Sequence, residues 1–139
     1  MAGTQEPYVT ARVSHSLDGL SGCVATAREF ADAFFGARGD RSQARADALL
    51  VVSELVTNAA RHAPGPCVLD LADDGNQWTI AVTDTSPDRP RPRPPDLETG
   101  KGGFGWHLLQ TLASDVRLLP TADGGKTITA TVSHGPHAS

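Results

Sequence analysis

Residues 53–63 read SELVTNAARHA, and they belong to a helical segment that begins near Ser42 and ends at the Pro-Gly-Pro run of residues 64–66. At about 100° per residue, one side of this segment carries an apolar stripe. The stripe consists of Leu49, Val52, Val56, Ala59 and Ala63. Glu54 and Asn58 project together from a different side. The segment therefore predicts a helix with one face in the core and another that carries a carboxylate and a carboxamide in register.

The polar pair has two interpretations. The simpler one is a solvated helix face, which is common on surface helices. The apolar neighbours Leu50, Val51 and Leu55 favour instead a largely buried helix whose polar pair faces a cleft. A carboxylate and an amide oxygen one turn apart offer the hard oxygen ligands that a hydrated Mg²⁺ ion prefers, or one of them orients a water while the other binds the metal.

The flanking segments predict the rest of the secondary structure. Residues 8–14 suit a first strand, and residues 20–37 have the spacing of an amphipathic helix. After the long helix the pattern changes to alternation in residues 67–72 and 77–83, which flank an Asp-Gly turn. Residues 105–114 return to a helix. Residues 116–119 and 126–133 then predict a closing pair of strands.

Residues 85–103 have no period and contain five of the ten prolines. An irregular segment of this length inside a compact domain is typically a functional lid or a disordered stretch. The order of the elements predicts an α+β fold, a two-layer sandwich with helices on one face of a mixed, mostly antiparallel sheet. The chain has no internal repeat, so residues 1–139 are expected to form a single domain with a flexible tail from about residue 134.

The composition narrows the class of protein. The net charge of −4 disfavours direct nucleic-acid binding, which depends on neutralising phosphates. The N-terminus lacks the pattern of a signal peptide, and the longest apolar run, residues 48–52, is far too short to cross a membrane. A cytoplasmic protein without a membrane segment is therefore expected. Cys23 and Cys67 are not spaced as a zinc pair, and free thiols are the simpler interpretation, with a single disulfide left open.

Two further segments carry candidate ligand groups. Asp84 ends an apolar strand, where a carboxylate either forms a turn or accepts a hydrogen bond from an exocyclic amine such as that of adenine. Residues 99–109 read TGKGGFGWHLL, with glycines and Lys101 just before a helix. This pattern is typical of a flexible hinge or of an anion site, because glycines let the backbone approach a phosphate and a helix N-terminus offers free N–H groups. The spacing is not that of a P-loop.

Taken in order, these segments resemble the boxes of the GHKL ATPase superfamily. ELVTNAARHA, residues 54–63, resembles its N box, and Asp84 stands where its first glycine box begins. GGFGWHLL, residues 102–109, resembles its second glycine box, and GGKTITATV, residues 124–132, resembles the late strand whose threonine reaches the nucleotide. The resemblance spans about residues 44–132. It implies the histidine-kinase-like ATPase (Bergerat) fold, with an ATP lid at about residues 85–103.

The small size of the chain and the sequence of its ELVTNAARHA segment are similar to those of stand-alone bacterial anti-sigma factor serine/threonine kinases. This resemblance implies ATP and Mg²⁺ as cofactors. It gives Glu54 the role of general base for the acceptor hydroxyl, Asn58 that of a magnesium ligand, and Asp84 that of an acceptor for the adenine amine. The other nucleotide-binding residues that it implies are Arg61, His62, Lys101, Gly102, Gly103, Phe104, Gly105 and Thr129.

The same resemblance implies two protein partners, a sigma factor that is sequestered and an anti-anti-sigma antagonist that is phosphorylated. It is also compatible with a homodimer formed through the sheet. The first glycine box departs from its usual Asp-x-Gly-x-Gly pattern, because residues 84–88 read DTSPD. This departure favours an alternative, an ATP-sensing or partner-sequestering module with weak or no catalysis. A third hypothesis is the catalytic half of a split histidine kinase, which would need a partner to supply the phosphoacceptor histidine.

Overall fold

The computed structural model describes residues 11–18, 22–37, 42–62, 66–85, 95–96, 101–102 and 104–134, without the side chains of residues 42, 62, 95–96, 101–102 and 104–106. The order of elements along the chain is that predicted from the sequence, with two additional two-residue strands in the predicted lid. The elements are β1 (Ala11–Leu17), α1 (Cys23–Gly36), α2 (Ser42–His62), β2 (Cys67–Asp73), β3 (Gln77–Asp84), β4 (Pro95–Asp96), β5 (Lys101–Gly102), α3 (Phe104–Leu112), β6 (Asp115–Pro120) and β7 (Lys126–Ser133).

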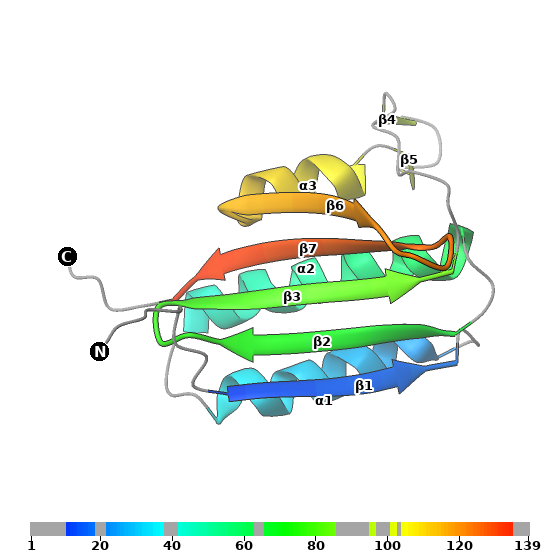
Figure 1. Ribbon diagram of the computed structural model, residues 1–139. Coiled ribbons are helices and arrows are strands. Elements are labelled where there is room, and N and C mark those ends of the chain that lie inside the picture. Colours follow the sequence, from blue (N-terminus) through cyan, green and yellow to red (C-terminus); the bar gives the residue numbers. More distant parts are fainter. Residues whose placement is uncertain are drawn as a thin grey trace, which may run out of the picture.

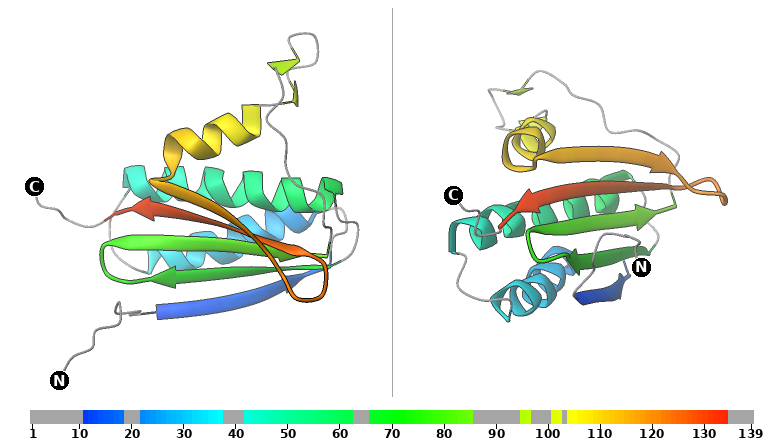
Figure 2. Two further views of the ribbon diagram at one scale, coloured as in Figure 1. Left: turned by 45° about the horizontal axis from the view of Figure 1, so that its top comes forward. Right: turned by 60° about the vertical axis from the view of Figure 1, so that its left-hand side comes forward.

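The main sheet has the strand order β1-β2-β3-β7-β6, and the three helices lie on one of its faces (Figures 1 and 2). This arrangement confirms the predicted α+β class and its two layers. Every strand pair among the described residues is antiparallel, where the sequence predicted a mixed, mostly antiparallel sheet. Short hairpins join β2 to β3 and β6 to β7, which is why neighbours in the chain become antiparallel neighbours in the sheet.

Helix α1 begins three residues later than predicted, whereas residues 8–10 of the predicted first strand lie outside the described residues. Strand β1 is placed by its pairing with β2, from Ala11 opposite Asp73 to Leu17 opposite Cys67. Helix α1 begins after Gly22, whose φ of 93° is a left-handed conformation that glycine adopts without strain. Such cap geometry is not encoded in hydrophobic periodicity, so the sequence identifies the helix but not its first residue.

Helix α2 is the centre of the core. It contacts α1, α3, β3 and β7, so it is covered on more than one side. The predicted stripe residues Val52, Val56 and Ala59 are buried, as are the following helix residues: Ala48, Val51 and Leu55. By contrast, 42% of Leu50 is exposed. The breadth of the buried surface confirms that the helix is largely enclosed, as its apolar neighbours indicated.

An aromatic stack lies at the end of the sheet where β3 begins. The ring centroids of Phe35 and Trp78 are 4.4 Å apart, and those of Trp78 and His134 are 4.3 Å apart. His134 Nε2 lies 2.9 Å from Asp73 Oδ1, and the His134 backbone N–H donates to the Asn76 carbonyl at 2.9 Å. His134 is therefore packed into the fold, although the flexible tail was expected to begin there. Residues 135–139 lie outside the described part of the chain.

Candidate functional site

Several predicted site segments meet at one end of the sheet. Figure 1 shows that β3 ends, β7 begins, and α2 ends on the same side of the molecule, with β5 and the start of α3 above them. The left view of Figure 2, in which the top of Figure 1 comes forward, agrees with this arrangement. We refer to this region as the strand-end site. It contains Asn58, Arg61 and Asp84 among the described side chains.

The polar face of α2 is only partly covered. Glu54 and Asn58 are each half-buried, one helical turn apart, while Leu55 and Val56 between them are 1% and 0% exposed. Arg61, in the last turn, is exposed. His62 is the last helical residue. The pair therefore lies at the boundary between core and solvent, which suits groups that must bind or deprotonate a partner while remaining fixed by a rigid helix.

Asp84 is buried and forms an ion pair. Lys126 Nζ lies 3.1 Å from Asp84 Oδ1 and 3.0 Å from Asp84 Oδ2, and each of the two side chains is 2% exposed. Cys67 lies beside Asp84 on the neighbouring strand β2, because the next residue, Val68, pairs with Thr83, the residue before Asp84. Burial, followed by the neighbouring Cys23 and the charge of Asp84, raises the pKa of the Cys67 thiol to about 11. Cys23 and Cys67 are both buried free thiols.

Gly125 allows β7 to approach β3 closely enough for this ion pair. A Cβ atom at Gly125 would lie 2.0 Å from the Asp84 carbonyl oxygen, so no other residue fits without a shift of the backbone. The turn before β7 is fixed by two contacts of Thr121. Its N–H donates to the Gly125 carbonyl at 3.1 Å, and its Oγ1 accepts from the Gly125 N–H at 3.0 Å.

Thr129 lies on the other face of the sheet. Asp84 pairs with Lys126, and side chains alternate along β7, so Lys126, Ile128 and Ala130 face the helices while Thr127, Thr129 and Thr131 face away. On that face Thr83 Oγ1 and Thr127 Oγ1 are 2.8 Å apart. The structure therefore does not bring Thr129 to Asp84. It brings Lys126 there instead, a residue of the GGKTITATV segment that sequence reasoning did not select.

The glycine-rich segment is described only in part. Lys101 and Gly102 form β5, which pairs with β4, and Phe104 and Gly105 open helix α3 as a helix N-terminus that follows glycines. Helix α3 is anchored by Leu109, which is 3% exposed, and contacts α2. Gly103 and most of the predicted lid, residues 86–94 and 97–100, lie outside the described residues.

No group of three or more His, Cys, Asp or Glu side chains that could hold a metal ion occurs among the described residues. Mg²⁺ commonly uses one or two protein oxygens and completes its shell with water and substrate phosphates. The amide oxygen of the half-buried Asn58 is a group of the kind that Mg²⁺ takes as one of its ligands.

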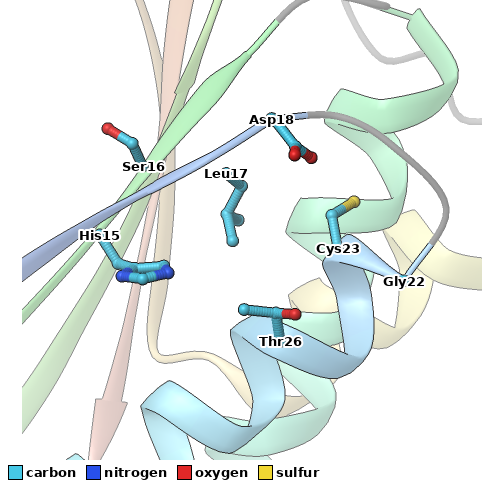
Figure 3. Close-up of a pocket in the computed structure, with 7 residues that line it drawn as sticks. All are labelled: His15, Ser16, Leu17, Asp18, Gly22, Cys23 and Thr26. Atoms are coloured by element: carbon cyan, nitrogen blue, oxygen red, sulfur yellow. The ribbon is translucent and has the colours of Figure 1, made fainter.

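A separate cavity lies beside the edge strand, between β1 and the start of α1 (Figure 3). Its volume is about 330 Å³, and it is lined by His15, Ser16, Leu17, Asp18, Gly22, Cys23 and Thr26. Among the predicted site residues whose side chains the structure describes, none lines it. Within the part of the chain that the structure describes, no helix is long and apolar enough to cross a membrane.

A five-stranded antiparallel sheet with three helices on one face is consistent with a GHKL-type ATPase fold. The sequence comparison agrees with this class. Residues 20–132 match the family described as the histidine kinase-like ATPase domain, and because this match covers most of the chain, the protein belongs to that family. No curated protein sequence is significantly similar to the chain.

Two solved structures share the fold. One contains the RsbU and RsbW domains of Rv1364c from Mycobacterium tuberculosis, with 24% identity, a TM-score of 0.65 and coverage of 91% of this chain and 33% of that chain. The present chain thus spans about a third of that protein's solved length. The other is the SiaB–SiaC complex from Pseudomonas aeruginosa, with 9% identity, a TM-score of 0.59 and coverage of 91% of both chains. At these identities the likeness supports the fold.

Proposed function

We propose that the protein binds Mg²⁺ and ATP at the strand-end site and transfers the terminal phosphoryl group to a serine or threonine of a partner protein. The observation that carries this proposal is the placement of Glu54 and Asn58. They are half-buried and one turn apart on a helix that is largely enclosed, and this helix ends on the same side of the molecule as β3, whose last residue is the buried Asp84. Membership of the histidine kinase-like ATPase family supports the nucleotide.

Each residue has a role that matches its chemistry. Bound Mg²⁺ and ATP supply the phosphoryl group and part of the charge neutralisation, and the protein's contribution is chiefly positioning. The amide oxygen of Asn58 would be a metal ligand. The carboxylate of Glu54 would accept the proton of the acceptor hydroxyl, a type of catalysis that contributes about 10²–10⁴-fold. The carboxylate of Asp84 would accept a hydrogen bond from the adenine amine.

The glycine-rich segment would hold the phosphates. Backbone N–H groups at the start of α3 have no partner within the helix, and the helix dipole places partial positive charge there. The proposal assigns Gly102, Gly103, Phe104 and Gly105 to this role through their backbone. Lys101, Arg61 and His62 would add positive charge or polar contacts around the phosphates.

The proposed partners are an anti-anti-sigma antagonist as phosphoacceptor and a sigma factor as the sequestered protein. A protein that acts on these two partners would work in the cytoplasm. The resemblance of the ELVTNAARHA segment supports this assignment. So does the fold shared with an RsbW domain and with a structure in which SiaB and SiaC form a complex. A homodimer formed through the helix-free face of the sheet belongs to the same proposal.

Calorimetric titration with ATP, with and without Mg²⁺, tests the nucleotide site. We expect micromolar, magnesium-dependent binding that is lost in Asn58→Ala. Asn76→Ala is the matched control, since Asn76 is exposed in the turn between β2 and β3, at the other end of the sheet. Absence of binding by the wild-type protein up to millimolar ATP would refute the proposal.

Phosphotransfer to a candidate antagonist tests catalysis. Glu54→Gln should retain ATP binding and lose transfer by about 10²-fold or more. Glu29→Gln, on the exposed side of α1, should change neither. If the wild-type protein binds ATP and partner but transfers no phosphate, the chain is the sequestering module instead. The altered first glycine box favours that alternative.

A further inference from the structure

The ion pair between Lys126 and Asp84 is buried at the strand-end site. The two side chains are each 2% exposed, and Lys126 Nζ contacts both carboxylate oxygens. Burying two charges is costly, and such pairs are often no more stabilising than apolar side chains of similar size. Stability alone therefore does not account for a lysine at this position of β7.

The geometry restricts the orientation of the Asp84 carboxylate. Nζ is nearly equidistant from the two oxygens, at 3.1 and 3.0 Å, so rotation of the carboxylate would break one of the two contacts. Lys126 is itself held in place, because Gly125 lies against the Asp84 backbone and Thr83 and Thr127 are joined on the opposite face. Asp84 and Lys126 also make further interactions. A ligand would therefore meet a carboxylate whose direction is already set.

The two purine bases differ at the atom that such a carboxylate would meet. Adenine carries an amino group at position 6, which donates hydrogen bonds, whereas guanine carries a carbonyl oxygen, which accepts them. An ion-paired carboxylate offers acceptors only, while a neutral carboxyl group can also donate. A fixed, charged carboxylate therefore attracts adenine and repels guanine at this position.

We propose that Lys126 is a positioning residue that makes the site select adenine over guanine by holding Asp84 as a fixed hydrogen-bond acceptor. The inference rests on the proposed function, in which Asp84 meets the base. Lys126 acts through Asp84 and need not touch the nucleotide.

The test compares three nucleotides on the purified full chain: ATP, GTP, and purine riboside triphosphate, which lacks the 6-amino group. In Lys126→Met the affinity for ATP should fall about 10- to 100-fold, the range expected when a hydrogen bond to a charged group is lost. The affinity for purine riboside triphosphate should change by less than about threefold, since this ligand has no 6-amino group to donate a hydrogen bond to Asp84. The preference for ATP over GTP should narrow accordingly, and Lys126→Arg, which keeps the charge, should restore most of it.

A matched control separates positioning from general destabilisation. His134→Gln disturbs the other buried pair, with Asp73, at the opposite end of the sheet. It should lower the thermal midpoint and leave the ratio of ATP to GTP affinity unchanged. If Lys126→Met does not fold, Lys126→Gln, which retains a donor without the charge, provides the same comparison.

The outcomes distinguish this inference from the function on which it rests. Equal weakening of all three nucleotides by Lys126→Met, or an unchanged preference for ATP, would overturn the role of Lys126 while leaving ATP binding established. A wild-type protein that binds none of the three would overturn both proposals. A wild-type protein that prefers ATP, and loses that preference only in the Lys126 variants that remove the charge, would establish the positioning role.

Discussion

Gly125→Ala should open the end of the sheet at the proposed nucleotide site. The new methyl carbon would lie 2.0 Å from the Asp84 carbonyl oxygen and 3.0 Å from both the Asp84 carbonyl carbon and the Thr85 Cα. Even close C–H···O contacts between strands have C···O distances of about 3.3–3.6 Å. The first residues of β7 must therefore move by more than about 1 Å relative to β3, and no flexible side chain is available to yield instead.

The expected cost follows from this displacement. Overpacking of a well-packed interior costs about 1–3 kcal/mol. The same shift lengthens the buried contact between Lys126 and Asp84, so we expect a loss of about 3 kcal/mol in the free energy of unfolding. For a domain of this size, that corresponds to a fall of roughly 10 °C in the thermal midpoint. ATP affinity should fall as well, because Asp84 is displaced.

Thermal and urea unfolding followed by circular dichroism measure the effect, with Gly124→Ala as the control. Gly124 has a φ of 94° and no atom within 4 Å of an added Cβ, so its substitution costs only backbone strain, about 1 kcal/mol. If Gly125→Ala proved no more destabilising than Gly124→Ala, the close approach of β3 and β7 would not be what requires glycine, and the reasoning would be wrong.

Three further predictions concern the packing of the core and the ionisation of the Cys67 thiol. Leu55→Ala should cost about 2–5 kcal/mol in urea unfolding, whereas Leu50→Ala should stay within about 0.5 kcal/mol, because Leu55 is 1% exposed and Leu50 is 42% exposed. His134→Ala should cost about 2 kcal/mol and reduce the near-ultraviolet signal of Trp78, since it removes both the ring stack and the contact with Asp73. The pKa of Cys67, raised from 9.0 to about 11, means that the unfolded thiol ionises first. Stability should therefore fall by up to about 3 kcal/mol between pH 9 and pH 11, and Cys67→Ala should remove that part of the pH profile.

Local patterns in the sequence were sufficient for the order of the elements and for the central helix. The 3.6-residue period of α2, the alternation in β2 and β3, and the Asp-Gly turn between them are interactions among near neighbours in the chain. The same period predicted that Val52 and Val56 lie in the core and that Glu54 and Asn58 share another side. These features depend on helix and strand geometry alone, so they can be predicted without knowing which elements pack against each other.

The contents of the strand-end site depend on pairing across the sheet. Lys126 meets Asp84 although 42 residues separate them, and only the register of β3 with β7 places Lys126 on the helix side and Thr129 on the other. His134 is similarly packed by Trp78 and Asp73 rather than by any local pattern. A shift of one residue in register would exchange the two faces of a strand. The sequence by itself therefore determined which elements form and which helix carries the polar pair, and tertiary pairing alone decided which side chains surround Asp84.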